Sequence, residues 1–268
     1  MAIIDFHTHV FPDDLAPRAI SVLLANSRES HNYTDGTLVA LRQSMQINGI
    51  GTSVLLPVAT KPSQVQGINR SCVDLKSNGI IPFGSLHPKT VNIEEEIAFL
   101  LENKIPGVKF HPEYQDFYID DPSMFKIYEQ LSEAGLIVVF HTGKDPGPFT
   151  CDHALPEALR NVLRNFPKMR VVAAHMGGWK VWDEVSKYLI GLPVYFDTSA
   201  VCDYLSPGDF LNIARKHGIE RILFGTDSPW FDQGYARSWI EKLDLTDREK
   251  EMIFEKNALS LLTTATAE

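Results

Sequence analysis

The chain has 268 residues, of which 44% are hydrophobic and 22% charged, and its formal net charge is -9 at pH 7. This composition is typical of a globular protein with enough apolar residues for a sizeable core. The acidic balance, without any block of Lys or Arg, argues against nucleic acid or an anionic membrane as a partner, and no apolar run reaches the ~20 residues of a membrane span.

The N-terminal residues and the cysteines indicate the cellular compartment. A strand pattern begins at residue 3 with no basic segment before it, so we expect no signal peptide. The three cysteines, Cys72, Cys151 and Cys202, lie far apart in the sequence and are odd in number. This argues against a disulfide framework or a cysteine zinc site. We therefore expect a cytoplasmic protein.

Short apolar runs alternate with helical patterns along the whole chain. The expected strands are Ile3–His7, Thr52–Val58, Ile80–Leu86, Gly107–His111, Leu136–His141, Arg170–His175, Val194–Thr198 and Arg221–Gly225. The expected helices are Thr37–Asn48, Ile93–Asn103, Ser123–Ala134, Pro156–Asn165, Pro207–His217 and Asp247–Leu262. Runs that are apolar throughout suit strands buried on both faces of a parallel sheet.

Eight such strands in a chain of this length favour a distorted (β/α)8 barrel, a single domain over residues 1–268, with loop insertions at its C-terminal face. A doubly wound open sheet is the alternative. The longer loops Val10–Asp35 and Gly143–Leu155 follow the first and fifth strands. Loops at that end of a barrel usually build the active site.

The first strand ends in His-x-His. Because side chains alternate along a strand, His7 and His9 point the same way. Two imidazoles held side by side on a rigid backbone make half of a metal site.

Other chemically active residues also lie at strand ends. Lys109 and His111 close the fourth expected strand, His141 closes the fifth and His175 the sixth, and Asp227 follows the eighth. In a barrel these ends converge on one mouth. Imidazole and carboxylate ligands suit zinc and similar divalent metals, so the sequence predicts a metal site there.

Six segments together resemble a known family. They are Asp-Phe-His-Thr-His from residue 5, Gly-Val-Lys-Phe-His-Pro from residue 107, Val-Phe-His-Thr-Gly from residue 139, Ala-His-Met-Gly-Gly from residue 174, Gly-Thr-Asp-Ser-Pro from residue 225, and Asn257-Ala258. The chain resembles the amidohydrolase superfamily, specifically its amidohydrolase-2 branch of small metal-dependent hydrolases and related decarboxylases.

The resemblance implies roles for individual residues. His7, His9, His141 and Asp227 would bind one divalent metal per chain, most often Zn2+. His175 would lie near the metal-bound water or the reacting oxygen of the substrate. Asp227 and His175 are thus the expected catalytic residues, with Asp227 passing the proton of the attacking water and His175 steadying negative charge.

The roles of Lys109 and His111 stay open. Three roles are open for Lys109: a carboxylated ligand that bridges to a second metal, a binder of an anionic substrate, or a partner in a structural ion pair. Since Lys109 and His111 share a strand face, both can reach the mouth. They are therefore candidates for a second metal site or for substrate binding.

The expected reaction is hydrolysis of an amide, ester or lactone in a small molecule. The alternative is non-oxidative decarboxylation of a small aromatic or unsaturated carboxylic acid on the same site, and a zinc-binding scaffold without activity is a further possibility. Candidate substrate-pocket residues in loops after strands are Tyr114, Phe149, Trp179 and Trp230. A homodimer is expected on general grounds.

Overall fold

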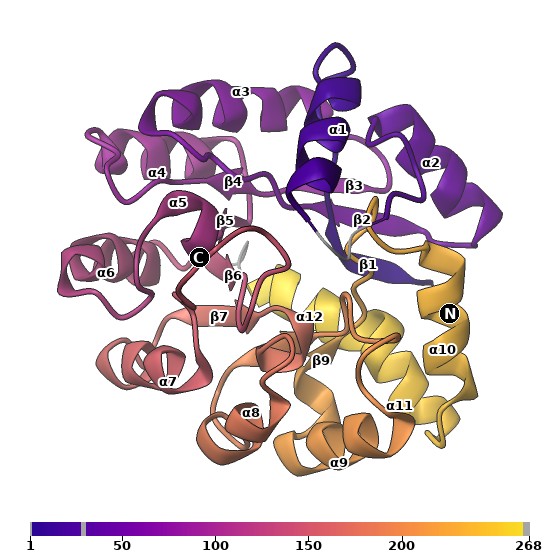
Figure 1. The fold of residues 1–268 in the computed structure, drawn as a ribbon. Helices are drawn as coiled ribbons and strands as arrows, with labels where there is room; N and C mark the ends of the chain where they lie inside the picture. The colour runs from indigo at the N-terminus through magenta and orange to yellow at the C-terminus, as the bar shows by residue number, and fades with distance from the viewer. Residues whose placement is uncertain (1, 28–30, 265–268) are drawn as a thin grey trace.

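A computed structural model describes residues 2–27 and 31–264. Short parallel strands form a ring that helices surround, as Figure 1 shows from one end of the barrel. The strands are β1 (Ile4–Thr8), β2 (Thr52–Leu55), β3 (Ile80–Pro82), β4 (Gly84–Ser85), β5 (Gly107–Phe110), β6 (Ile137–Phe140), β7 (Arg170–Ala173), β8 (Tyr195–Asp197) and β9 (Ile222–Leu223).

Most helices lie outside the ring and connect successive strands. They are α1 (Ala16–Asn26), α2 (Leu38–Ile47), α3 (Val65–Leu75), α4 (Ile93–Glu102), α5 (Pro112–Gln115), α6 (Phe125–Glu133), α7 (Pro156–Asn165), α8 (Trp182–Tyr188), α9 (Pro207–His217), α10 (Gln233–Lys242), α11 (Asp247–Glu251) and α12 (Asn257–Thr264).

Every strand pairs in parallel with its neighbours in chain order, from β1 to β3 and from β4 to β9. Only Phe83 separates β3 from β4, so these two form one bent strand that pairs first with β2 and then with β5. The ring closes because Phe6 N donates to Phe224 O at 2.7 Å and Asp227 N donates to His7 O at 2.8 Å. The predicted (β/α)8 barrel is confirmed, and the open-sheet alternative is wrong.

Several elements differ from the prediction. The expected loop Val10–Asp35 contains helix α1, and helices α3, α8 and α10 have no predicted counterpart. The expected strand Ile80–Leu86 is split at Phe83. The expected helix Asp247–Leu262 is interrupted by a π-helical turn at Met252–Lys256.

The barrel interior is apolar below its mouth. Residues of β1, β2, β6, β7 and β9 form one buried cluster, against which Ala258 and Leu261 of α12 pack. Helix α12 therefore covers one end of the ring, and it lies behind the strands in Figure 1. Asn257 fixes this helix by donating to Ile219 O at 2.7 Å and to Ile222 O at 2.8 Å.

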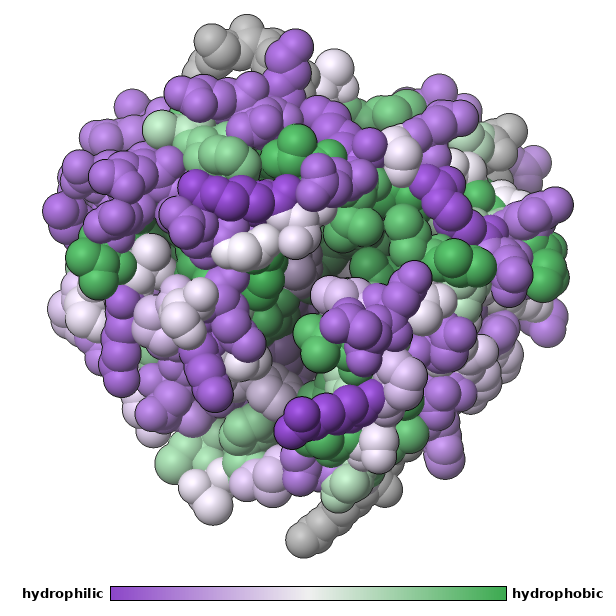
Figure 2. Space-filling view, turned by 90° about the horizontal axis from the view of Figure 1, so that it is seen from above, coloured by the Kyte–Doolittle hydropathy of each residue, from purple (hydrophilic) through white to green (hydrophobic). Residues whose placement is uncertain are grey.

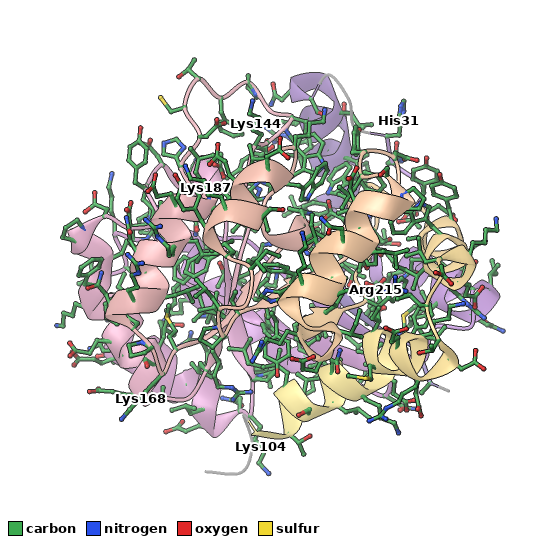
Figure 3. All side chains as sticks on the ribbon, turned by 90° about the horizontal axis from the view of Figure 1, so that it is seen from below. His31, Lys104, Lys144, Lys168, Lys187 and Arg215 are labelled. Atoms are coloured by element: carbon green, nitrogen blue, oxygen red, sulfur yellow. The ribbon has the colours of Figure 1, made fainter. Side chains whose placement is uncertain are left out.

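The two ends of the barrel can be told apart by labelled cations. Lys104 and Lys168 precede β5 and β7, whereas Lys144 follows β6. Figure 3 shows Lys144 at the end opposite to Lys104 and Lys168. We call the end where the strands finish, on the side of Lys144, the mouth.

The outer surface is mixed in polarity. Figure 2 shows apolar side chains gathered between polar ones on the face seen from above. Exposed large apolar side chains of α1 and α2 include Val22, Val39 and Ile47. No helix among the described residues combines the length and apolar character that a membrane span requires.

Candidate metal centre

The predicted residues do gather at the mouth. His7 lies in β1 and His9 just after it, Lys109 lies in β5, and His141 directly follows β6. The remaining two, His175 and Asp227, follow β7 and β9 and adopt positive φ angles of 58° and 70°. Backbone in this region is strained for residues other than glycine, and such strain occurs most often at functional sites.

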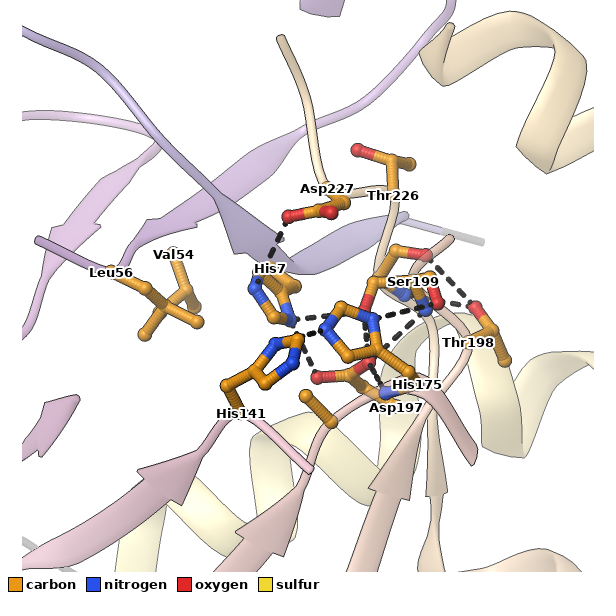
Figure 4. Close-up of polar contacts among 12 residues, drawn as sticks. His7, Val54, Leu56, His141, His175, Asp197, Thr198, Ser199, Thr226 and Asp227 are labelled. Atoms are coloured by element: carbon orange, nitrogen blue, oxygen red, sulfur yellow. Dashed lines mark hydrogen bonds and ion pairs between the residues drawn. The ribbon is translucent and has the colours of Figure 1, made fainter. Parts of the chain in front are cut away.

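Three ligand atoms meet at the centre of this group. Asp227 Oδ1 lies 3.1 Å from His9 Nε2 and 3.4 Å from His7 Nε2. The rings of His7 and His9 are 5.1 Å apart between centroids, at an interplanar angle of 71°. We call these three residues the primary cluster, and Figure 4 shows how His7 and Asp227 face each other within it.

Hydrogen bonds behind the primary cluster fix which ring nitrogens point into it. His9 Nδ1 lies 2.8 Å from Leu56 O, which can only accept, so Nδ1–H donates there. His7 Nδ1 donates in the same way to Asp197 Oδ2 at 2.8 Å. When the rings act as ligands, the lone pair of each therefore lies on Nε2 and faces the carboxylate of Asp227. Metal-binding histidines are commonly held through their other nitrogen in this way.

This arrangement fits a divalent metal ion. Two atoms that each lie about 2.1 Å from a tetrahedral ion are separated by about 3.4 Å, close to the distances seen here. Burial, and then the positive charge of Lys109, lower the pKa of His7 to about 4, so the ring is neutral as a ligand must be. Burial opposes the ionisation of Asp227, but its contacts with His9 and His7 hold its pKa below the ordinary value.

Lys109 lies directly beside the primary cluster. Its side chain is fully buried, and its Nζ is 3.4 Å from His7 Nε2. Burial lowers the pKa of Lys109 to about 8, against the opposing pull of the Asp197, Asp227 and Glu113 charges. At neutral pH the mouth therefore contains a desolvated ammonium group next to the candidate ligands.

His141 is placed differently from the prediction. Its Nδ1 lies 3.0 Å from His175 Nε2, and its Nε2 lies 3.0 Å from Lys144 O. The compact sets of ligand atoms among the described residues do not combine His141 with the primary cluster. Instead the ring of His141 stacks on that of His111, with centroids 4.1 Å apart.

His175 links the two histidine groups. Its ring centroid is 5.2 Å from that of His7 and 4.8 Å from that of His141. Its Nδ1 lies 2.8 Å from Ser199 Oγ and 3.1 Å from Ser199 O, as Figure 4 shows. Burial lowers the pKa of His175, so this ring too is held neutral.

The four predicted pocket residues have different surroundings. Tyr114 packs edge-on against His111, with centroids 4.6 Å apart, and against Phe149, with centroids 5.0 Å apart. Trp179 is buried and donates from Nε1 to Ala200 O at 3.1 Å, so it packs the barrel mouth. Trp230 is half-buried, and its main-chain N donates to Asp227 O.

Sequence reasoning missed four polar residues of the site. Asp197 ends β8 and Ser199 lies two residues beyond it, both with buried side chains, and Glu113 and Asp145 lie in segments that follow β5 and β6. An acidic residue at the end of a strand was the available signal for Asp197. For Glu113 and Asp145 the signal was only that each lies within a few residues of a strand-end histidine.

Asp5 holds the Asp227 loop in place. It is fully buried and accepts hydrogen bonds from Thr226 Oγ1 at 2.6 Å, from Thr226 N at 3.0 Å and from Gln233 Nε2 at 2.7 Å. Thr226 immediately precedes Asp227, so Asp5 joins the first strand to the last part of the site. Burial raises the pKa of Asp5 to about 7.

Comparisons with known proteins identify the family of this chain. An amidohydrolase family model matches residues 4–263. A 2-amino-3-carboxymuconate-6-semialdehyde decarboxylase from Dictyostelium discoideum is 23% identical over 205 residues, which are 64% of this chain and 57% of that protein. A gamma-resorcylate decarboxylase from Polaromonas sp. is 23% identical over 43% of this chain and 40% of its own length. The chain thus spans about half the length of these relatives.

Solved structures show the same fold. The 5-carboxyvanillate decarboxylase LigW from Sphingomonas paucimobilis matches with a TM-score of 0.77 at 15% identity, over 98% of this chain and 99% of that one. An uncharacterised TIM-barrel protein from Bordetella bronchiseptica matches with a TM-score of 0.76 at 21% identity, over 99% of both chains. A dihydroxybenzoic acid decarboxylase from Polaromonas sp. with bound manganese matches with a TM-score of 0.75 at 14% identity, over 98% of this chain and 97% of that one.

The family model covers nearly the whole chain, and the solved structures share the barrel fold. The chain therefore belongs to the amidohydrolase family, in its amidohydrolase-2 branch.

Proposed function

We propose that this protein is a metal-dependent decarboxylase that removes CO2 from a small aromatic or unsaturated carboxylic acid without oxidation. The observation that carries the proposal is the buried ammonium of Lys109, 3.4 Å from His7 Nε2. A substrate carboxylate would supply the counter-ion that such a desolvated cation favours. A neutral amide or lactone would add no negative charge to those of Asp197, Asp227 and Glu113 that already act on Lys109.

Two further observations support this choice over hydrolysis. The curated relatives reported above are named as decarboxylases, as is LigW. In addition, Tyr114 and Phe149 form an aromatic pair beside His111 at the mouth, which suits a flat unsaturated substrate. The substrate is a small molecule, since the site lies within the barrel mouth.

Each residue of the site has a separate role in the proposed decarboxylation. The bond between the carboxyl group and its neighbouring carbon breaks, the electron pair stays on that carbon and takes up a proton, and CO2 leaves. A divalent ion held by His7, His9 and Asp227 would polarise a substrate oxygen. Lys109 binds the carboxylate and orients it. The proton comes from solvent water: His175 Nε2, which lies 3.0 Å from His141 Nδ1, accepts it on its lone pair and then donates it to the carbon.

Hydrolysis of an amide, ester or lactone remains the second candidate function. The observation that favours it is the position of Asp227, whose carboxylate lies 3.4 Å from His7 Nε2 and 3.1 Å from His9 Nε2 and could accept a proton from water. His175 would then steady negative charge on the carbonyl oxygen. The metal is either Zn2+ or Mn2+ in both schemes, because imidazole and carboxylate ligands suit both ions.

One panel of assays separates the two functions. The purified protein, loaded with Zn2+ or Mn2+, is given hydroxybenzoic and unsaturated carboxylic acids while CO2 release is followed, and then esters, amides and lactones while hydrolysis is followed. We expect CO2 release that a chelator abolishes. Hydrolysis without CO2 release from any acid would overturn the proposal.

A pair of lysine variants sharpens the result. Lys109→Gln is expected to raise KM for the acid by about 10- to 100-fold, the loss of one hydrogen bond to a charged group. The exposed Lys168 lies at the opposite end of the barrel, so Lys168→Gln is the matched control and should leave KM unchanged. An unchanged KM in Lys109→Gln would remove Lys109 from carboxylate binding.

A further inference from the structure

A pocket separate from the primary cluster lies between the C-terminal end of α1 and the loop that follows β6. Its volume is about 360 Å³, and the residues that line it are Asn26, Pro146, Gly147, Pro148, Phe149 and Thr150. Helix α1 follows β1 and the loop follows β6, so both walls belong to connections at the strand-end side of the barrel. The residues that form the primary cluster do not line this pocket, and no step of the proposed reaction uses it.

The pocket joins the proposed substrate site through two of its wall residues. The ring of Phe149 packs against Tyr114 with centroids 5.0 Å apart, and Tyr114 in turn packs against His111 at 4.6 Å. Gly147 N donates to Asp145 Oδ1 at 2.7 Å, and the other oxygen of Asp145 lies 3.4 Å from His111 Nε2. The pocket therefore shares its Phe149 wall with the aromatic pair at which we place the substrate.

The volume of the pocket limits what it can hold. A protein cavity of about 150 Å³ accommodates a benzene ring. A pocket of about 360 Å³ thus has room for a substituted ring or for a chain of similar size. A hydroxyl or methyl group alone would leave most of this space to water. The pocket therefore suits a part of a ligand that is at least as large as an aromatic ring.

The walls of the pocket carry no formal charge. Among the described lining residues only Asn26 and Thr150 have polar side chains. Pro146 and Pro148 fix their backbone φ angles and have no N–H, so they form a stiff apolar wall beside Phe149. A carboxylate or an ammonium group would meet no opposite charge in these walls. An uncharged ring can instead pack on the prolines and Phe149, and a hydroxyl or carbonyl group on that ring can hydrogen-bond to Asn26.

We propose that this pocket is a second substrate subsite, which binds an uncharged group of about the size of an aromatic ring. The other end of the substrate rests on the proposed function, with its carboxylate bound by Lys109. The substrate is then a two-part acid, with a carboxylated unsaturated head at the primary cluster and a neutral tail that passes Tyr114 and Phe149 to reach Asn26. An acid with a single ring would fill only the head site.

Binding of matched acids tests the subsite without any turnover. Dissociation constants of benzoic acid and of biphenyl-2-, biphenyl-3- and biphenyl-4-carboxylic acid are measured by NMR titration of the full chain loaded with Zn2+. Burial of the second ring should make at least one biphenyl acid bind about 10- to 100-fold more tightly than benzoic acid. A ratio near one for all three biphenyl acids would overturn the proposal.

Two tryptophan variants show where the second ring binds. Asn26→Trp adds a large side chain to the pocket wall and should reduce the affinity ratio to near one. Ser21 is exposed on the same helix and does not line the pocket, so Ser21→Trp is the matched control and should keep the ratio. Circular dichroism shows whether both variants fold. An unchanged ratio in folded Asn26→Trp would mean that the second ring binds elsewhere, against the proposal.

Asn26→Leu tests the hydrogen bond separately, because leucine is close to asparagine in size but has no amide. Derivatives of the tightest biphenyl acid carry one hydroxyl group at successive positions of the second ring. The best of them should gain about 2- to 10-fold in affinity for the unaltered protein, the contribution of one hydrogen bond. The same hydroxyl should give no gain in Asn26→Leu. An equal gain in both proteins would contradict the role of Asn26.

A charge comparison separates the subsite from the proposed function. Lys109→Gln should weaken the binding of benzoic and biphenyl acids alike and leave their ratio unchanged. Benzamide and the biphenyl carboxamides should show the same preference for the second ring, with no dependence on Lys109. If Lys109→Gln bound the acids as tightly as the unaltered protein, carboxylate binding by Lys109 would fail while the subsite stood. Acids that need Lys109 but show no preference for a second ring would give the opposite result.

Discussion

Asp197 and His7 form a buried hydrogen-bonded pair, with 2.8 Å between Asp197 Oδ2 and His7 Nδ1. The strands that carry them, β8 and β1, are separated only by β9 in the closed ring, so this bond spans one strand at the mouth of the barrel. Because the carboxylate holds the proton on Nδ1, it keeps the lone pair of His7 on Nε2, where Asp227 lies 3.4 Å away. Asp197 is therefore a positioning residue for the primary cluster.

Asp197→Asn should weaken metal binding without removing any ligand. Replacement of such a supporting carboxylate typically costs 10- to 100-fold in metal affinity. We expect a loss in that range in a competition titration with a chromophoric chelator, and a larger loss in Asp227→Asn, which removes a ligand. Equal affinities in Asp197→Asn and the unaltered protein would show that His7 does not need this partner.

Asp227→Asn should give a folded protein with almost no activity. Asp227 adopts φ of 70°, and asparagine tolerates this left-handed region about as well as aspartate, so the backbone can stay in place. The variant nevertheless loses the carboxylate that faces His7 and His9 and any proton transfer through it. Circular dichroism checks that the variant folds, and turnover on the substrate identified by the assay panel checks its activity. Full activity would exclude Asp227 from the chemistry.

The barrel could be predicted because its strands are buried on both faces. Ile137-Val138-Val139-Phe140 is apolar throughout and is completely buried as β6. Such a run leaves little alternative to a parallel sheet covered by helices. Helix α1 was missed because its largely apolar sequence lies in a long connection between strands, and only Ala16 and Ile20 of it are buried.

The site could be predicted only where strand geometry dictates it. His7, His9, Lys109 and Asp227 meet because strand ends converge at the mouth. His141 lies apart from the primary cluster because its hydrogen bond to His175 turns the ring, and that bond depends on the non-helical turn at His175, with φ of 58°. Asp145 and Glu113 depend on loop conformations, which no strand or helix period encodes.

His217 should make stability depend on pH independently of any metal. Both nitrogens of its neutral ring make hydrogen bonds: Nε2–H donates to Val194 O at 2.8 Å, and Nδ1 accepts from Gly191 N at 3.2 Å. Burial lowers the pKa of His217 below its ordinary value of 6.5. As the pH falls below 6.5 the unfolded chain binds a proton that the native ring does not, so the free energy of unfolding decreases, by at most about 1.4 kcal/mol per pH unit.

Urea unfolding at pH 5.5 and 7.5 measures this contribution. In His217→Gln the loss of stability between the two pH values should be smaller than in the unaltered protein. His31 is exposed, so His31→Gln is the control and should keep the original pH dependence. If His217→Gln also kept the original pH dependence, the His217 ring would have to bind a proton equally well in the folded and the unfolded protein.

Gly143 should be intolerant of any side chain, because it lies where the loop after β6 touches the segment after β7. Its φ is +91°, and an added Cβ would lie 2.2 Å from Trp179 N and 2.5 Å from Gly178 C. Both are main-chain atoms and cannot move without shifting the loop that carries Asp145. Left-handed strain of about 1–2 kcal/mol and overpacking of about 1–3 kcal/mol should together destabilise Gly143→Ala by about 2–5 kcal/mol.

Gly135→Ala separates these two contributions. Gly135 also has a positive φ, of +66°, but an added Cβ would meet no atom within 4 Å. This variant should therefore lose only the ~1–2 kcal/mol of left-handed strain. Urea unfolding of both variants gives the difference directly, and equal losses would mean that the loop after β6 can move away from Trp179.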